Sequence, residues 1–359
     1  MAAPKPKAPG KTKVARNKRI TEVGDIAVAP GERGSVDLPI TDLYTHTQMS
    51  MPVEVVNGKH AGPVLVVCAA IHGDEINGVE IVRRLLAAPS LKRLRGTLIA
   101  VPIVNVLGFL NLSRYLPDRR DLNRCFPGSA TGSSASRLAN RFCREILRQA
   151  DVAIDLHTAA VHRSNLPQIR VTQDDHAALE LAEVFAAPVI VSSEIREGSL
   201  REVAQKQGVP IIVYEAGEAL RFDEPSIRAG VRGVQRVMRK LGMLPGRSPK
   251  SFGAPVHAND SAWARAPRSG ILVHAPRLGA RVKQGDLVAT ISDPVGAEQT
   301  NVLSPHDGIV IGRVELPLVH AGDALCHIAE FEHPIVAERT VAAFVEHQSS
   351  GQTTDESPA

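Results

Sequence analysis

A histidine and a glutamate lie three residues apart in the sequence: His72 and Glu75 in the segment IHGDE, directly after the apolar run 63–71. If this segment opens a helix, one turn of backbone directs both side chains toward one point. An imidazole nitrogen and a carboxylate oxygen there are both ligands for Zn²⁺. By itself this spacing is common, and a polar surface turn is its more frequent meaning. The pair indicates a metal site only if other ligands converge on it.

Two more polar residues follow short apolar segments. His157 comes after 152–156 in VAIDLHT, and Glu215 comes after 210–214 in PIIVYEAGE. A lone histidine in such a place is more often a hydrogen-bonded core residue. In open parallel sheets, however, sites form outside the carboxyl ends of the strands. Three separate strands would then deliver these side chains to one edge, and this convergence is what predicts a site.

The types of these residues indicate catalysis. Two histidines and one carboxylate leave a position open on Zn²⁺, as in catalytic zinc sites, where the metal lowers the pKa of bound water to about 7. A second carboxylate must take the water proton and deliver it to the leaving group, and Glu215 is the candidate general base. The same ligand set also suits iron and other metals. Asp155, two residues before His157, either orients a histidine or is a capping or surface carboxylate, and both interpretations stay open.

The stretch 107–134 is irregular and rich in Arg, Asn, Pro and Gly, and so long a stretch inside a compact domain is usually functional. Within SRYLPDRRDLNRCFPG, residues 113–128, Arg114, Asn123 and Arg124 offer planar donors suited to a carboxylate or an oxyanion. Asp121 is a candidate for holding the loop. We expect the neighbouring arginines, Arg119 and Arg120, to be solvated.

Together the motifs IHGDE, DLNRCFPG, DLHT and YEAGE resemble those of the succinylglutamate desuccinylase/aspartoacylase family of zinc carboxypeptidase-like enzymes, over about residues 50–245. The resemblance implies one zinc per chain, on His72, Glu75 and His157, with Glu215 as general base and acid. It implies that Asn123 and Arg124 bind the substrate carboxylate. It also implies that an arginine upstream of DLNR polarises the scissile carbonyl. Arg114 fits that role best, although its gap to DLNR is slightly longer than in aspartoacylase.

The elements that must position these residues alternate between strands and helices. Apolar runs predict strands at 53–56, 64–70, 97–104, 152–156, 169–172, 188–191 and 210–214. Helical spacing predicts helices from the IHGDE loop to about residue 88 and at 135–149, 175–185, 200–207 and 224–241. This order predicts an α/β fold, with a mostly parallel or mixed twisted sheet flanked by helices.

The C-terminal part repeats itself. SGILVHAPRLGARVKQGDLVATI at 269–291 parallels DGIVIGRVELPLVHAGDALCHI at 307–328, which predicts a smaller all-β, pseudo-symmetric barrel-sandwich. It resembles the lipoyl/biotinyl-type domain found in one branch of the family. Carriers of that type need a lysine at a hairpin tip, and the matching hairpin 292–302 has none; Lys283 lies in another turn. We therefore expect a substrate-gating or oligomer-forming cap without an attached cofactor.

Charge is distributed unevenly along the chain, and this helps to divide it into segments. The net charge is +4, but the first twenty residues carry +7, so the remainder carries −3. We predict a disordered basic tail at 1–22, a zinc hydrolase domain at 23–246, the β-sandwich at 247–345 and a disordered tail at 346–359. The basic tail is more simply a solvated arm than a nucleic-acid or membrane contact.

Aromatic residues are scarce at 3%, no apolar run is long enough to span a membrane, and the four cysteines form no CxxC pair. These features favour a cytoplasmic enzyme with reduced thiols that binds neither nucleic acid nor membrane. Whether it forms a homo-oligomer is left open.

The sequence thus predicts a zinc-dependent amidohydrolase that cleaves the amide bond of a small N-acyl amino acid, the class of hydrolases acting on linear amides other than peptides. A metallocarboxypeptidase acting on peptide C-termini would use the same residues and is the alternative. A non-catalytic carrier built on the β-sandwich is disfavoured by the missing hairpin lysine and the intact ligand-and-base set.

Overall fold

The computed structural model describes residues 20–248 and 253–349. Most of the two predicted disordered tails therefore lies outside the described residues. Of the first tail, Thr21 and Glu22 lie in a strand, and residues 346–349 of the second continue a helix. These two ends of the predicted tails are structured. In the described ranges, no helix is both long and apolar enough to cross a membrane.

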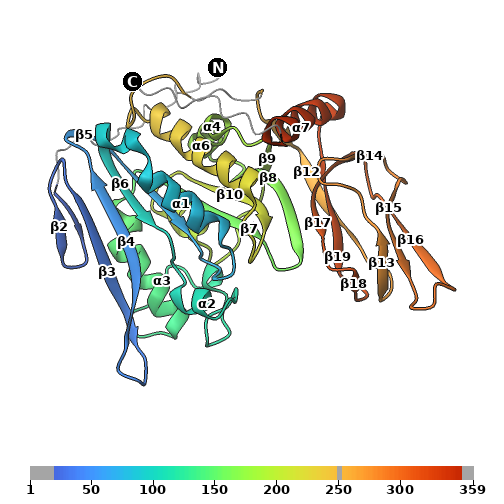
Figure 1. Ribbon diagram of the computed structural model, residues 1–359, viewed down its shortest axis with the longest axis horizontal. Coiled ribbons are helices and arrows are strands. Elements are labelled where there is room, and N and C mark those ends of the chain that lie inside the picture. The colour runs from blue at the N-terminus through green and yellow to red at the C-terminus, as the bar shows by residue number, and fades with distance from the viewer. Residues whose placement is uncertain (1–19, 249–252, 350–359) are drawn as a thin grey trace, which may run out of the picture.

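One large mixed sheet dominates the fold (Figure 1). Its path runs β12-β19-β17-β8-β10-β7-β5-β6-β4-β3, and β9, β11 and β14 pair at its side. The central strands β10, β7, β5 and β6 are parallel to one another, whereas β8 runs antiparallel to β10, and β4 runs antiparallel to both β6 and β3. Strands β1 (Thr21–Val23) and β2 (Ile26–Val28) form a separate pair. The first strands of the large sheet along the chain are β3 (Arg33–Asp42), β4 (Gln48–Asn57), β5 (His60–Ala69), β6 (Arg95–Val101), β7 (Val152–Ala159), β8 (Arg163–Val171), β9 (Val189–Ser192) and β10 (Ile211–Glu218).

Helices cover both faces of this sheet. On one face α1, α4 and α6 share a core with alternate residues of the strands, such as Leu65 and Ile154; on the other, α3 and α5 pack with Val66 and Ala153. A strand buried on both faces reads as a continuous apolar run, which explains the composition of β5. The helices are α1 (Asn77–Ala87), α2 (Val106–Leu110), α3 (Ser134–Glu145), α4 (His176–Phe185), α5 (Leu200–Lys206), α6 (Glu224–Lys240) and α7 (Pro334–Ser349), with 3-10 turns η1 (Pro89–Arg93), η2 (Leu122–Arg124) and η3 (Leu147–Gln149).

Local sequence signals set where several helices begin. The side chains of Ser133, Asp175, Ser199 and Asp223 each accept a backbone N–H of the first turn of α3, α4, α5 and α6. Such side chains replace the hydrogen bonds that the first N–H groups of a helix lack. This is why these helices start within a residue or two of the predicted positions.

The C-terminal strands form the smaller all-β region, beside β8 (Figure 1, orange to red). The two repeat halves give equivalent strands, and the short strand of each half pairs with the first strand of the other: β14 with β17, and β18 with β13. The fold class, α/β with a smaller all-β part, is confirmed. The strands are β11 (Val256–Ala258), β12 (Asp260–Arg265), β13 (Gly270–His274), β14 (Arg281–Val282), β15 (Leu287–Ser292), β16 (Gln299–Leu303), β17 (Gly308–Val314), β18 (Leu318–Val319) and β19 (Ala324–Glu330).

Helix α7 was not predicted from the sequence, and it crosses the expected boundary between residues 345 and 346. Ala337, Val341 and Phe344 are its buried side chains, at helical spacing, and the first two pack on β17, β9 and β11. Because this apolar stripe consists of only three residues, it indicates a helix less clearly than the repeat indicates β-strands. The domain limits themselves stay a prediction.

Candidate active site

Three predicted ligands meet at the edge of the central sheet. His72 and Glu75 lie in the turn between β5 and α1, and His157 lies in β7. Glu75 Oε1 is 2.6 Å from His72 Nδ1, Glu75 Oε2 is 2.7 Å from His157 Nδ1, and the two Nδ1 atoms are 3.2 Å apart. All three residues are buried, and their ligand atoms lie within 4.8 Å of one another. Two imidazole nitrogens and a carboxylate that face a common point match the donor set of a divalent metal ion.

The turn that carries His72 and Glu75 is tightly packed. Gly73 lies against α2, where a Cβ would be 2.1 Å from the backbone carbon of Gly108. No side chain fits in that space, so a glycine between the two ligands lets the turn approach α2. The backbone N–H of Glu75 donates to the carbonyl of His72 at 3.1 Å, which closes the turn.

A carboxylate contacts the far nitrogen of each histidine. Asp155 Oδ2 lies 2.8 Å from His157 Nε2, and Asp121 Oδ1 lies 3.2 Å from His72 Nε2. A carboxylate there fixes the Nε2–H tautomer and leaves the lone pair of Nδ1 facing the common point. Of the two interpretations of Asp155, orientation of a histidine agrees with this contact. Asp121 was expected only to hold its loop, and its contact with His72 is an addition to the predicted site.

The pKa shifts follow from this arrangement. Burial alone would raise the pKa of Glu75, but the imidazoles of His72 and His157 hold it well below its usual range. Burial also raises the pKa of Asp121, but His72 and Arg114 together lower it by more. The pKa of Asp121 is therefore well below its usual range. Both groups are therefore carboxylates, which is the form that binds a cation or accepts an N–H.

Glu215 lies beside the three ligands on the neighbouring strand. In the parallel pair of β10 with β7, Glu215 is directly opposite His157, so both side chains point to the same face of the sheet. Asn165 Nδ2 donates to Glu215 Oε2 at 2.8 Å, and Arg170 Nε forms an ion pair with Oε1 at 3.1 Å. Both partners come from β8.

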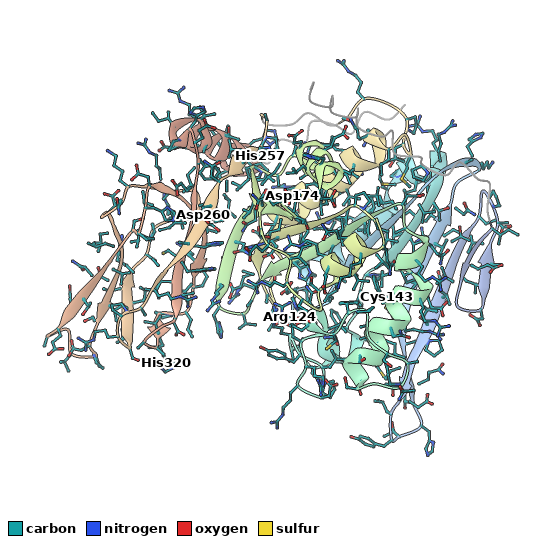
Figure 2. All side chains as sticks on the ribbon, turned by 180° about the vertical axis from the view of Figure 1, so that it is seen from behind. Arg124, Cys143, Asp174, His257, Asp260 and His320 are labelled. Carbon is teal, nitrogen blue, oxygen red and sulfur yellow. The ribbon has the colours of Figure 1, made fainter. Side chains whose placement is uncertain are left out.

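The predicted residues of the arginine-rich loop differ in how close they lie to the three ligands. Arg114 lies against the three ligands: its Nη1 is 3.3 Å from Glu75 Oε1, and its Nη2 donates to Asp121 Oδ2 at 2.8 Å. Asn123 Oδ1 accepts the N–H of Leu200 at 2.9 Å, which ties the loop to the start of α5. Figure 2 shows Arg124 between the C-terminal strands and α3. Arg119 and Arg120 are exposed, as expected.

The three candidate ligands, Glu215 with its two partners on β8, Asp155, Arg114, Asn123 and Arg124 line one cavity of about 600 Å³. The C-terminal strands β12 and β19 form part of its wall through Ser261, Trp263, Arg265, Ala324 and His327. Seven arginines line the cavity, against four acidic residues, and two of those acids, Glu75 and Asp155, contact the histidines. The cavity therefore favours an anionic ligand. The seven arginines are Arg114, Arg124, Arg163, Arg170, Arg196, Arg201 and Arg265.

The cavity brings together every predicted site residue: His72, Glu75, Arg114, Asn123, Arg124, His157 and Glu215. Sequence reasoning missed two sets of residues: the partners of Glu215 on β8, and the residues through which the C-terminal part, expected as a substrate-gating or oligomer-forming cap, lines the cavity. Neither had a signal in the sequence, because Asn165, Arg170 and Trp263 belong to no motif and reach the cavity only through strand pairing. The individual roles of the predicted residues stay predictions.

Known proteins resemble this chain in sequence and in fold. The model of the succinylglutamate desuccinylase/aspartoacylase catalytic domain matches residues 61–241. The N-alpha-acetyl-L-2,4-diaminobutyric acid deacetylase of Halomonas elongata is 26% identical over 313 residues, covering 83% of this chain and 91% of that protein.

Solved structures agree. The product-bound ectoine utilization protein EutE (DoeB) from Ruegeria pomeroyi is 25% identical with a TM-score of 0.77, over 89% of this chain and 100% of that one. The succinylglutamate desuccinylase/aspartoacylase from Rhodobacter sphaeroides is 27% identical with a TM-score of 0.76, over 83% and 96% of the two chains.

Fold, site and relatives define the class of this protein: it is a hydrolase that acts on carbon–nitrogen bonds of amides other than peptide bonds. The chain belongs to the succinylglutamate desuccinylase/aspartoacylase family, as its motifs predicted.

Proposed function

We propose that this protein is a zinc-dependent amidohydrolase that removes the acyl group from a small N-acyl amino acid. The observation that carries the proposal is a buried set of two histidines and a carboxylate in the same cavity as a separate glutamate, Glu215. Amide hydrolysis needs both parts, since the carbonyl must be polarised and a proton must move from water to the leaving nitrogen.

His72, Glu75 and His157 would hold the metal ion. The donor set fits zinc: three protein ligands leave a position open, and Asp155 and Asp121 orient the two imidazoles. When bound there, zinc supplies a Lewis acid that polarises a carbonyl oxygen and makes water more acidic.

Glu215 is the proposed general base and acid. Its carboxylate takes a proton from the attacking water while the water oxygen bonds to the acyl carbon. The same carboxylate then gives the proton to the amide nitrogen as the carbon–nitrogen bond breaks, which yields a carboxylic acid and a free amine. Arg114 is the proposed donor of hydrogen bonds to the acyl oxygen as negative charge develops on it, and its ion pair with Glu75 beside the ligands supports this role.

Asn123 and Arg124 are the proposed contacts of the substrate carboxylate. Asn123 uses its side-chain oxygen on the N–H of Leu200, so its amide N–H₂ is the part that remains for a ligand. A guanidinium and an amide both donate to carboxylate oxygens, and the excess of arginines in the cavity supports an anionic substrate. The relative from Halomonas elongata is named as the deacetylase of an N-acetylated amino acid, which supports an N-acyl amino acid as the substrate here.

The test is a panel of N-acetyl and N-succinyl amino acids and short peptides, followed by amine release, with metal analysis of the same sample. We expect about one zinc per chain, release from one or more N-acyl amino acids, and loss of activity with a chelator. Turnover of peptides alone would favour a metallocarboxypeptidase. Full activity in metal-free protein would refute the proposal.

A further inference from the structure

The carboxylate of Glu215 is held by an unequal pair of contacts. Asn165 Nδ2 donates to Oε2 at 2.8 Å with hydrogen-bond geometry. Arg170 Nε is 3.1 Å from Oε1, but this buried Nε makes no hydrogen bond. An ion pair without alignment supplies charge but little direction, whereas a hydrogen bond fixes the orientation of its acceptor. In the described part of the chain, Asn165 is thus the side chain that sets where the Glu215 carboxylate points.

Asn165 lies where the catalytic sheet joins the C-terminal strands. On β8 it is opposite Gly217 of β10 on one side and opposite Gly312 of β17 on the other. Asn165 is 7% exposed. Its surroundings are therefore supplied by two parts of the chain that are more than 90 residues apart in sequence.

The orientation of the amide follows from chemistry and packing. An ionised carboxylate only accepts hydrogen bonds, so Asn165 must present its N–H₂ to Glu215 and turn Oδ1 away. A Cβ on Gly312 would lie 2.8 Å from Asn165 Oδ1 and 3.2 Å from His327 Cβ. The missing side chain at Gly312 leaves the space that the carbonyl end of the amide occupies.

An aromatic pair of the C-terminal strands closes this space. The rings of Trp263 and His327 stack with centroids 4.5 Å apart and planes 6° apart, and both residues line the cavity. His327 is directly opposite Gly312 in the pair of β17 with β19, and Trp263 is directly opposite His327. The row from Trp263 through His327 and Gly312 to Asn165 crosses four strands and ends at Glu215.

We propose that Asn165 is a positioning residue for Glu215, and that the C-terminal strands, through Gly312, hold its amide in the orientation that catalysis needs. The proposal rests on the role of Glu215 proposed above. It makes the C-terminal β region part of the catalytic apparatus, in addition to forming a wall of the cavity.

The test compares four variants of the full-length, zinc-loaded protein by kcat, KM, metal content and thermal unfolding. Asn165→Leu keeps a side chain of similar size without the N–H₂ group. We expect it to lower kcat about 10- to 100-fold, as for a base displaced from its productive position, with KM within about threefold and metal content unchanged. Gly312→Ala leaves Asn165 in place but crowds its Oδ1 atom. It should also lower kcat, by a smaller factor.

Ser164→Ala is the matched control. Ser164 precedes Asn165 on β8, is opposite Arg313 of β17, and lines a different cavity. It should keep the wild-type kcat, which shows that a change on this strand is not harmful in itself.

Glu215→Gln separates the two proposals. If it loses activity while folded Asn165→Leu and Gly312→Ala keep the wild-type kcat, Asn165 does not position the base, and the proposed function stands. If Asn165→Leu loses zinc or raises KM as much as it lowers kcat, its role is structural, which overturns the inference. If Asn165→Leu does not fold, the kcat of Gly312→Ala decides. Full activity in Glu215→Gln refutes the proposed function itself.

Discussion

Replacing Glu215 with glutamine tests the proposed chemistry with little change in shape. Glutamine keeps an oxygen that can accept the N–H of Asn165, so the hydrogen bond at 2.8 Å can persist. The ion pair with Arg170 is lost, but both side chains are partly exposed, at 23% and 20% for Arg170 and Glu215. Pairs of this kind contribute about 1 kcal/mol or less, so the melting temperature should fall by a few degrees at most.

The effect on the reaction should be much larger. Loss of a general base lowers kcat about 10²- to 10⁴-fold, which corresponds to about 3–5 kcal/mol in the activation barrier. The catalytic loss thus exceeds the loss of stability several-fold. The assay is amine release from the best substrate of the panel, with zinc content measured on the same preparation. A variant that keeps its zinc and turns over within about threefold of the wild type would refute the role of Glu215.

Four further predictions follow from the contacts. His157→Ala should lose zinc together with activity, and a variant that retains stoichiometric zinc would remove His157 from the ligand set. Asp155→Asn should weaken zinc binding about 10- to 100-fold in chelator competition, because the asparagine can turn its N–H₂ toward the imidazole and lose its orienting role; an unchanged affinity would contradict this. Arg124→Ala should raise KM about 10-fold or more with a smaller change in kcat, since a charge-assisted hydrogen bond to the substrate is lost; an unchanged KM would exclude the contact. Phe142→Ala, at a fully buried position of α3, should cost about 3–5 kcal/mol in the free energy of unfolding by denaturant, and a cost under about 1 kcal/mol would be inconsistent with the packing described.

Much of the fold was predictable because its signals are local. The continuous apolar run of β5 and the Ser or Asp residues before α3 to α6 mark strands and helix starts within a few residues. The repeat at 269–291 and 307–328 predicted a small all-β region with two equivalent halves, but not that the short strand of each half pairs with the first strand of the other. Helix α7 escaped prediction because its apolar stripe has meaning only against the strands it covers.

The candidate metal ligands were also predictable, for a topological reason. His72 and Glu75 follow one parallel strand, His157 and Glu215 lie in the carboxyl-terminal halves of two others, and parallel strands present their carboxyl ends at one edge. Order and spacing along the chain were therefore sufficient to bring them together. Asp155 was visible because it shares a strand face with His157, whereas the contact of Asp121 with His72 depends on how its irregular loop folds back.

The kinds of elements, the parallel centre of the sheet and the residues that meet at its edge follow from short segments of the chain, since apolar period and residue type are local properties. The surroundings of Glu215, in contrast, depend on how the assembled strands pair. A register shift between Glu215 and Gly217 in the pair of β10 with β8 changes the alternation of side chains, so that Asn165 and Arg170, five residues apart, both reach the same carboxylate. The pairing of β8 with β17 then brings Trp263 and His327 to the cavity wall, because strands distant in sequence become neighbours only when the sheet assembles.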